Sequence, residues 1–377
     1  ADGDNDADLF VGSGGNNMPQ GSRELQHRLY LNDGKGNFTL QLKSFPSNND
    51  NTSVAVANDF DGDGDQDLFV GSRCVSREYG VTPTSHLYSN DGKGHFTEMP
   101  ADKISGINQA GMVTGAVWAN ITGDNAKELI VVGAWMAPKV FEYKSNAFHE
   151  VKSNLDEMNG WWQTIAATDI DKDGYDDLIM GNIGDNFYLQ ASAQAPLKLW
   201  LTDFDENNTV DAVLSRSINK KDVPVFMKRE ITDQLPALKK QNLKHEDFAQ
   251  KSIQDLFGAT LLKTTQMKQI NYTHSCIVYG AKTHTFKTEV LPEEVQFSSL
   301  NAVLCADINK DGNTDLLLGG NMFSFPPQFG RLDASYGQVL INHGKKQFTE
   351  VAATQSGYSL NGEVKDIKTI HGKNKEY

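Results

Sequence analysis

The feature that most constrains the fold is a short acidic motif that returns along the chain. The copy at residues 61–71 has the sequence DGDGDQDLFVG. The other copies, some of them weaker, are DGDNDADLFVG at 2–12, NITGDNAKELIVVG at 120–133, DIDKDGYDDLIMG at 169–181, DFDENNTVDAVL at 203–214 and DINKDGNTDLLLG at 307–319. The last acidic residues of the first three copies, Asp8, Asp67 and Glu128, are 59 and 61 residues apart. A period of this length indicates a repeat architecture.

A second element follows the acidic motif, about 21 residues after it in the first two units. LYLNDGKGNFT at 29–39 and LYSNDGKGHFT at 87–97 each place Asn-Asp-Gly-Lys-Gly between strand-forming residues, and VLINHGKKQFTEV at 339–351 is a related copy. Glycines in such a turn supply the positive φ that a β-hairpin needs. The second unit therefore predicts four strands, at 53–58, 67–72, 86–89 and 95–99.

Repeated four-stranded units predict an all-β fold, a β-propeller in which neighbouring blades bury the faces of each sheet. We expect a single domain over residues 1–377, with seven blades favoured and six as the alternative. Residues 231–258 carry apolar residues at helical spacing and predict one short helical insertion within a blade. The strands of that blade are expected to resume at 276–280 and 285–290. Residues 364–370 resemble a first strand, which either closes the ring or continues into a longer protein.

The acidic loops have the composition of calcium sites. Ca²⁺ takes six to eight oxygen ligands, and carboxylates at loop positions 1, 3, 5 and 9 can converge when Gly or Asn turns the chain at position 6, with the carbonyl of position 7 adding one more. Strands rather than helices flank these loops, which excludes EF-hands. The predicted metal positions are Asp59, Asp61, Asp63, Asp65 and Asp67; Asp169, Asp171, Asp173, Tyr175 and Asp177; Asp203, Asp205, Asn207, Thr209 and Asp211; Asp307, Asn309, Asp311, Asn313 and Asp315; and Asp2, Asp4, Asp6 and Asp8.

These loops predict about four to five Ca²⁺ sites. The third copy, with Asn120, Thr122, Asp124 and Glu128, has too little negative charge and is expected to be an empty turn. Calcium sites of extracellular modules often bind in the millimolar range. We therefore expect a secreted, periplasmic or cell-surface protein that calcium stabilises.

The acidic loops followed by DLFVG strands resemble the FG-GAP/VCBS repeat family, calcium-loop propellers that include the integrin α-subunit head. Together with NDGKGxFT, GWWQT at 160–164, GNIGDN at 181–186 and GRLDASYG at 330–337, they are similar to the secreted ASPIC/UnbV-type propellers of Bacteroidota. The resemblance implies a propeller fold and bound calcium. It does not identify a ligand.

The net charge and the absence of known catalytic motifs argue against several classes of function. With 35 Lys+Arg against 49 Asp+Glu, the net charge of −14 argues against nucleic-acid binding, and no apolar run is long enough for a transmembrane segment. No GxSxG, HExxH, Walker A or GxGxxG motif occurs. We expect a non-catalytic scaffold that binds an extracellular protein or glycan, with a calcium-dependent polysaccharide lyase as the alternative. The candidate ligand contacts are Trp161, Trp162, Phe329, Arg331 and Tyr336.

Overall fold

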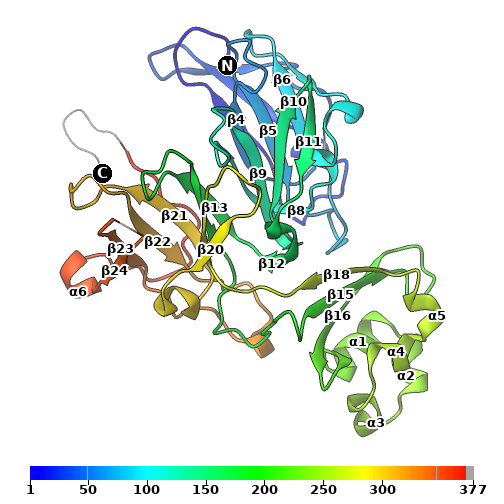
Figure 1. The fold of residues 1–377 in the computed structure, drawn as a ribbon. Helices are drawn as coiled ribbons and strands as arrows, with labels where there is room; N and C mark the ends of the chain where they lie inside the picture. Colours follow the sequence, from blue (N-terminus) through cyan, green and yellow to red (C-terminus); the bar gives the residue numbers. More distant parts are fainter. Residues whose placement is uncertain (49, 345, 371–377) are drawn as a thin grey trace.

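The computed structural model describes residues 1–48, 50–344 and 346–370 and contains six antiparallel sheets in that part of the chain (Figure 1). We number them by their first strands. Sheet 1 comprises β1 (Leu9–Val11), β2 (Arg28–Asn32) and β3 (Phe38–Gln41), and sheet 2 comprises β4 (Thr52–Asn58), β5 (Asp67–Ser72), β6 (His86–Asn90) and β7 (Phe96–Glu98). Sheet 3 comprises β8 (Met112–Ala119), β9 (Glu128–Met136), β10 (Lys139–Lys144), β11 (Ala147–Val151) and β12 (Gly160–Trp161).

The last three sheets contain the main departure from simple repetition. Sheet 4 comprises β13 (Thr164–Thr168), β14 (Asp177–Gly181), β19 (Cys276–Tyr279) and β20 (Lys287–Val290); sheet 5 comprises β15 (Leu197–Thr202), β16 (Asp211–Ile218), β17 (Lys221–Pro224) and β18 (Gln266–Ile270). Sheet 6 comprises β21 (Leu300–Ala306), β22 (Asp315–Gly320), β23 (Gln338–Asn342) and β24 (Phe348–Val351). Sheet 5 is thus inserted between two paired strands of sheet 4.

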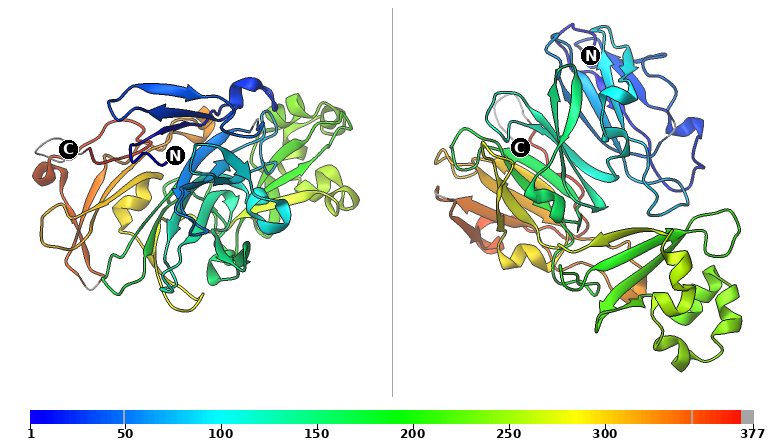
Figure 2. Two further views of the ribbon diagram at one scale, coloured as in Figure 1. Left: turned by 90° about the horizontal axis from the view of Figure 1, so that it is seen from above. Right: turned by 45° about the vertical axis from the view of Figure 1, so that its right-hand side comes forward.

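This insertion corrects one prediction. The strands at 276–280 and 285–290 are predicted to belong to the blade with the helical insertion, which follows the acidic motif ending at Asp211, but β19 pairs with β14 and completes sheet 4. Sheet 5 is closed instead by β17 and β18, which flank its central hairpin on either side. The Asp211 unit is therefore not one of the series, and five sheets follow one another. Figures 1 and 2 show sheet 5 and its helices as a separate lobe.

The helical segment is more broken than predicted. Instead of one helix over 231–258, short helices occur at α1 (Lys228–Gln234), α2 (Ala237–Gln241), α3 (His245–Ala249), α4 (Ile253–Phe257) and α5 (Ala259–Leu262), and α6 (Ala353–Ser356) follows sheet 6. Pro236 cannot donate a backbone hydrogen bond and separates α1 from α2. Gly258, at φ 76°, ends α4. Ile231, Leu235 and Leu238 pack on Trp200 and Val213 of sheet 5, which gives the insertion its own core.

Single-turn 3₁₀ helices occupy several connections between strands. They are η1 (Arg23–Leu25), η2 (Ala101–Lys103), η3 (Ile107–Gln109), η4 (Asn154–Glu157), η5 (Glu293–Phe297) and η6 (Pro327–Phe329). The longest of these, η5, lies in the connection between sheets 4 and 6, and its Val295 and Gln296 are buried.

The core lies between adjacent sheets. Every residue of β5 is buried, because one face of this strand packs on sheet 1 and the other on sheet 3. Ile130 and Leu178 belong to a cluster that joins sheets 3 and 4, and Ile179 and Leu316 belong to one that joins sheets 4 and 6. Buried strand faces of this kind explain why the motif ends in a continuous apolar run rather than an alternating one.

The glycines that end the apolar runs of sheets 2 and 4 lie where neighbouring sheets touch. A Cβ atom on Gly71 would lie 2.6 Å from Val113 Cγ1 of sheet 3, and one on Gly181 would lie 2.2 Å from the carbonyl oxygen of Leu300 of sheet 6. These separations are below those that real Cβ atoms show. At Gly181 the neighbour is a backbone atom, so only glycine permits this close approach of sheets 4 and 6.

The segment after α6 approaches the glycine at the end of an apolar run in the same way. Val364 N–H donates to the carbonyl oxygen of Gly320 at 2.9 Å, as Leu300 N–H donates to that of Asn182 at 3.0 Å. Val364 also contacts the Cβ position of Gly319, the counterpart of Gly181. This segment thus begins at the place where the first strand of a following sheet would start.

Candidate functional site

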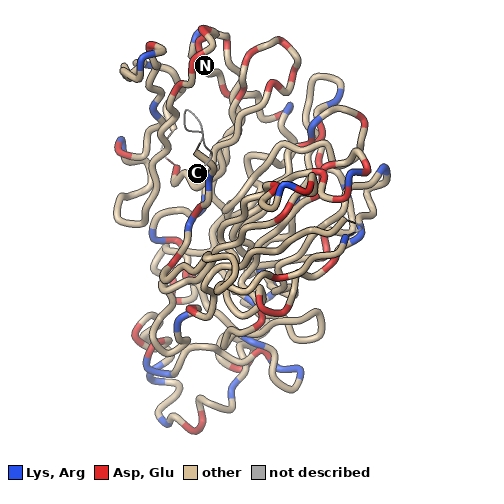
Figure 3. Tube along the Cα trace, turned by 90° about the vertical axis from the view of Figure 1, so that its left-hand side faces the viewer, with Lys and Arg blue, Asp and Glu red and all other residues tan. Residues whose placement is uncertain are grey.

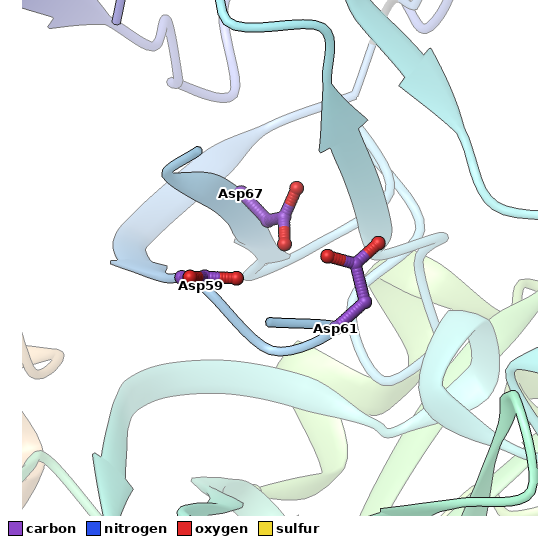
Figure 4. Close-up of side chains that lie close together, drawn as sticks. All are labelled: Asp59, Asp61 and Asp67. Atoms are coloured by element: carbon purple, nitrogen blue, oxygen red, sulfur yellow. The ribbon is translucent and has the colours of Figure 1, made fainter. Parts of the chain in front are cut away.

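The loop between β4 and β5 gathers three carboxylates. Asp59, Asp61 and Asp67 each offer an oxygen, and these oxygens lie within 4.8 Å of one another (Figure 4). Gly64, at φ 96°, makes the turn predicted at position 6, and its N–H donates to Asp59 Oδ2 at 3.1 Å. The local sequence therefore folds the chain back so that its acidic side chains face a common point.

Two further loops repeat this geometry. The carboxylate oxygens of Asp169, Asp171 and Asp177 lie within 4.8 Å of one another, as do those of Asp203, Asp205 and Asp211. The first of these loops connects β13 and β14, and the second connects β15 and β16 in the inserted sheet. The recurrence in separate sheets shows that the spacing of the acidic residues, rather than one local packing, produces the cluster.

The last aspartate of each loop is buried and anchors the loop to the strands. Asp67 Oδ1 accepts a hydrogen bond from Asn90 N–H at 2.9 Å, and its Oδ2 accepts one from Phe60 N–H at 3.2 Å. Asp177 makes the equivalent bonds with Gly280 N–H at 2.8 Å and Ile170 N–H at 2.9 Å. One carboxylate at the start of the second strand therefore holds both the loop and the end of the third strand.

Burial and charge crowding disfavour the ionised form of these anchors. Desolvation, with the nearby charges of Asp61 and Asp63, raises the pKa of Asp67 to about 6. Desolvation, with the charges of Asp171 and Asp173, raises the pKa of Asp177 to about 7. Both anchors accept backbone hydrogen bonds that act in the opposite direction, so burial is the larger effect. A bound divalent cation would reverse the penalty by supplying the missing positive charge.

The donor set fits a hard cation. Every side-chain donor in the three clusters is a carboxylate oxygen, the ligand type that Ca²⁺ prefers. Asp205 Oδ1 is buried and has no hydrogen-bond partner within the described residues, which leaves it available as a ligand. At the loop of Asp171, however, the Lys346 ammonium lies 2.7 Å from the carboxylate and 3.8 Å from the ring centroid of Tyr279. A cation there would have to compete with this lysine.

The remaining predicted positions are arranged less uniformly. Asp307 accepts from Asp311 N–H at 3.0 Å and Gly312 N–H at 2.9 Å, and Asn309 at position 3 donates to Asp311 at 3.0 Å. The sixth loop thus has the common turn but an amide in place of one carboxylate. In the first loop the amino group of Ala1 pairs with Asp8.

Among the described residues, the Asp63 and Asp173 carboxylates are not part of the three clusters, and the carbonyl and amide positions of the loops stay predictions. Asp63, Asp173 and Asn207 each accept a backbone N–H two residues ahead, at 2.9, 3.0 and 2.8 Å. In the third loop Glu128 accepts from Ile121 N–H at 3.0 Å and from the Thr122 hydroxyl at 2.7 Å. Both bonds come from the loop itself, and an empty turn at this position stays a prediction.

The five candidate ligand contacts separate into two groups. Trp161 and Phe329 line a cavity of about 690 Å³ at the junction of the insertion with sheets 2, 3 and 6. Trp162 is fully buried, and its indole N–H donates to the carbonyl oxygen of Met158 at 3.2 Å, so it belongs to the core. Arg331 lies over the ring of Phe323, and Tyr336 is exposed; neither lines that cavity.

Comparison with known families finds parts of this chain similar to FG-GAP repeats. The model of the FG-GAP-like repeat matches residues 1–70 and 59–131, and that of the FG-GAP repeat matches residues 161–188. A search of curated protein sequences found no match. The matched segments contain the clusters at Asp59–Asp67 and Asp169–Asp177, whereas the cluster in the inserted sheet lies outside them.

Proposed function

We propose that this protein is a calcium-stabilised, propeller-type binding scaffold of the FG-GAP kind that acts outside the cytoplasm. The observation that carries the proposal is the recurrence of one three-carboxylate geometry in separate sheets. The match to FG-GAP repeats supports it, because such repeats typically bind ligands. A closed ring of seven blades, or of six, stays a prediction.

Calcium has a structural rather than a catalytic role in this proposal. Asp59, Asp61 and Asp67, with the carbonyl of Asp65, would hold one ion, and the loop Asp203–Asp211 would hold another. Neither cluster pairs with a lysine or arginine within the described ranges, unlike the cluster at Asp171. A bound ion offsets the mutual repulsion of the carboxylates and fixes the turn that leads into the second strand.

The molecular surface agrees with a binding partner other than nucleic acid. Figure 3 shows acidic and basic residues interspersed along the loops on the face in view, without a basic stripe. No helix in the described part of the chain is both long and apolar enough to cross a bilayer. The partner we propose is an extracellular protein or glycan.

The proposal is tested by thermal unfolding in EDTA and across a calcium titration to 10 mM, with magnesium as the control. We expect a rise in Tm that is specific to calcium, because Mg²⁺ demands near-ideal octahedral geometry and gives up its waters reluctantly. Stabilisation at a hundredfold excess over Kd is about 2.7 kcal/mol per site. An unchanged Tm would show that the loops are self-sufficient turns. Formation of unsaturated uronates from a polysaccharide panel would instead favour the lyase.

A further inference from the structure

The cavity lined by Trp161 and Phe329 lies at the ends of sheets 2, 4 and 6 opposite their acidic loops, and the end of the acidic loop of sheet 5, Thr209–Asp211, also lines it. Each acidic loop joins the first strand of a sheet to the second, so the connection that follows the second strand emerges at the other end. Three such connections, after β5, β14 and β22, contribute to the cavity, together with the end of β9. Its volume of about 690 Å³ is that of a typical small-molecule site.

Aromatic side chains from separate segments form the body of the cavity. The rings of Trp135 and Trp161 lie 5.4 Å apart, and Phe325 meets Trp161 edge-on at 5.3 Å. Phe226 of the insertion and Phe329 of the loop before β23 are 5.6 Å apart. These rings come from sheet 3, the insertion and sheet 6, so the cavity exists only when the insertion is docked.

Trp135 is held in a conformation that a bulky residue rarely adopts. Met136 pairs with Gly160 and Ala134 pairs with Trp161, which leaves Trp135 as the extra residue of a β-bulge, at φ 61°. Bulges re-aim side chains and concentrate beside functional sites. Here the bulge turns the indole into the cavity, where its N–H donates to the Tyr79 hydroxyl at 2.8 Å. This strain is a local cost that the packing of the sheet alone does not explain.

The cavity carries positive charge in a strongly acidic protein. Arg73 and Arg77, from the connection after β5, line it, and neither forms an ion pair within the described ranges. Gly80, in the same connection, would place a Cβ atom 2.7 Å from Leu199 and Leu201 of the insertion, so this connection is fixed against the lobe. In a chain of net charge −14, two unpaired arginines beside aromatic walls favour an anion with an apolar body.

Asp211, the one acidic lining residue in the described part of the chain, already makes hydrogen bonds. Asp211 Oδ1 accepts a hydrogen bond from Gln234 at 3.1 Å, and its Oδ2 accepts one from Phe204 N–H at 3.1 Å. Its carboxylate also belongs to the cluster with Asp203 and Asp205. The Asp211 carboxylate thus already interacts with its own loop and with Gln234, whereas Arg73 and Arg77 are available to contact a ligand.

We propose that this cavity binds a small organic anion with an aromatic body, whose carboxylate pairs with Arg73 and Arg77 while its ring packs among Trp135, Trp161 and Phe329. The inference rests on the proposed binding function and specifies the ligand class. It places recognition where the insertion docks on the other sheets, beside the acidic loop of sheet 5.

Isothermal titration in 5 mM CaCl₂ tests the proposal with three probes: naphthalene-2-carboxylate, the neutral naphthalene-2-carboxamide, and glucuronate, which has the charge without the apolar ring. We expect the carboxylate to bind at least tenfold more tightly than either of the others. The double variant Arg73→Gln/Arg77→Gln is expected to lose at least tenfold in affinity for the carboxylate and to leave the carboxamide unchanged.

The matched control is Arg23→Gln/Lys35→Gln, which removes the same charge from connections of sheet 1 that do not line the cavity. It is expected to bind like the parent protein. Equal affinity for the carboxylate and the carboxamide, equal losses in the two double variants, glucuronate binding as tightly as naphthalene-2-carboxylate, or no binding at all would each overturn the proposal. Since the calcium-dependent Tm is measured separately, such a failure would leave the calcium scaffold standing.

Discussion

Replacing Gly181 by alanine tests whether successive sheets are held together by the glycine at the end of each apolar run. The new Cβ atom would lie 2.2 Å from the carbonyl oxygen of Leu300 and 2.7 Å from Thr164 Cγ2, where ordinary contacts begin near 3.4 Å. The carbonyl belongs to the backbone and cannot rotate away. Sheets 4 and 6 must therefore move apart by roughly 1 Å.

The expected cost has two parts. Overpacking of a core typically costs about 1–3 kcal/mol. The movement also stretches the hydrogen bond from Leu300 N–H to the carbonyl oxygen of Asn182, now 3.0 Å long, and losing it adds about 1 kcal/mol. We therefore expect Gly181→Ala to lower the free energy of unfolding by about 2–4 kcal/mol, measured by urea unfolding in calcium and followed by tryptophan fluorescence.

Gly71→Ala is the matched control, because it stands at the same repeat position but meets only side-chain methyls. Its Cβ atom would lie 2.6 Å from Val113 Cγ1 and 2.8 Å from Val54 Cγ1, groups that can shift. We expect at most half the loss seen at Gly181, and partial recovery when Val113→Ala is added. Equal losses at the two positions, or no loss at Gly181, would refute the argument from backbone contact.

Two further changes address the loops and the histidine between sheets 1 and 2. Asp61→Asn should abolish the calcium-dependent stabilisation from its loop, which is about 2.7 kcal/mol at a hundredfold excess over Kd. Asp65→Asn keeps the carbonyl ligand and should retain this stabilisation. Calcium titrations of Tm compare the two variants. Burial lowers the pKa of His27 from 6.5 to about 3, so the folded protein holds the ring neutral while the unfolded chain takes up a proton below 6.5. Stability should therefore fall as pH falls from 6.5 towards 3, by about 2 kcal/mol at pH 5. His27→Gln should remove that share of the pH dependence. His86, whose pKa Asp50 and Glu98 raise, contributes with the opposite sign in both proteins. If the difference in the free energy of unfolding between pH 7 and pH 5 is the same in the parent protein and the variant, the assignment to His27 is wrong.

The acidic loops and the strands around them were predictable because their determinants are local. The turn at Gly64 and the carboxylates on either side of it lie within nine residues, and the hairpin Asn90–Phe96 follows from its Asn-Asp-Gly-Lys-Gly turn. The four strands of sheet 2 agree with the predicted ranges to within two residues. Local turn chemistry fixed both their existence and their order.

The partner of β14 was not predictable in the same way. Strand pairing between β14 and β19 spans the whole insertion, and nothing in the sequence of Cys276–Tyr279 distinguishes it from a strand of the preceding unit. Only some of the residues that line the cavity could be predicted from the sequence. Trp161 and Phe329 stood out as aromatic, but exposed arginines such as Arg73 and Arg77 carry no periodic signal, and their convergence depends on how the insertion docks.

The insertion also delays the pairing of β14 with β19 while the chain is synthesised on the ribosome. The edge of β14 that β19 will cover is synthesised roughly a hundred residues before its partner, which at 5–20 residues per second is an interval of roughly 5 to 20 s. During that interval an apolar strand edge is unpaired, and such edges are templates for aggregation. The insertion can use the same time to fold, because its hairpin β15–β16, its helices and their core around Trp200 are complete before β19 emerges. In the finished fold this lobe interrupts sheet 4. During synthesis it is a unit that can fold before β19 and β20 are available to complete that sheet.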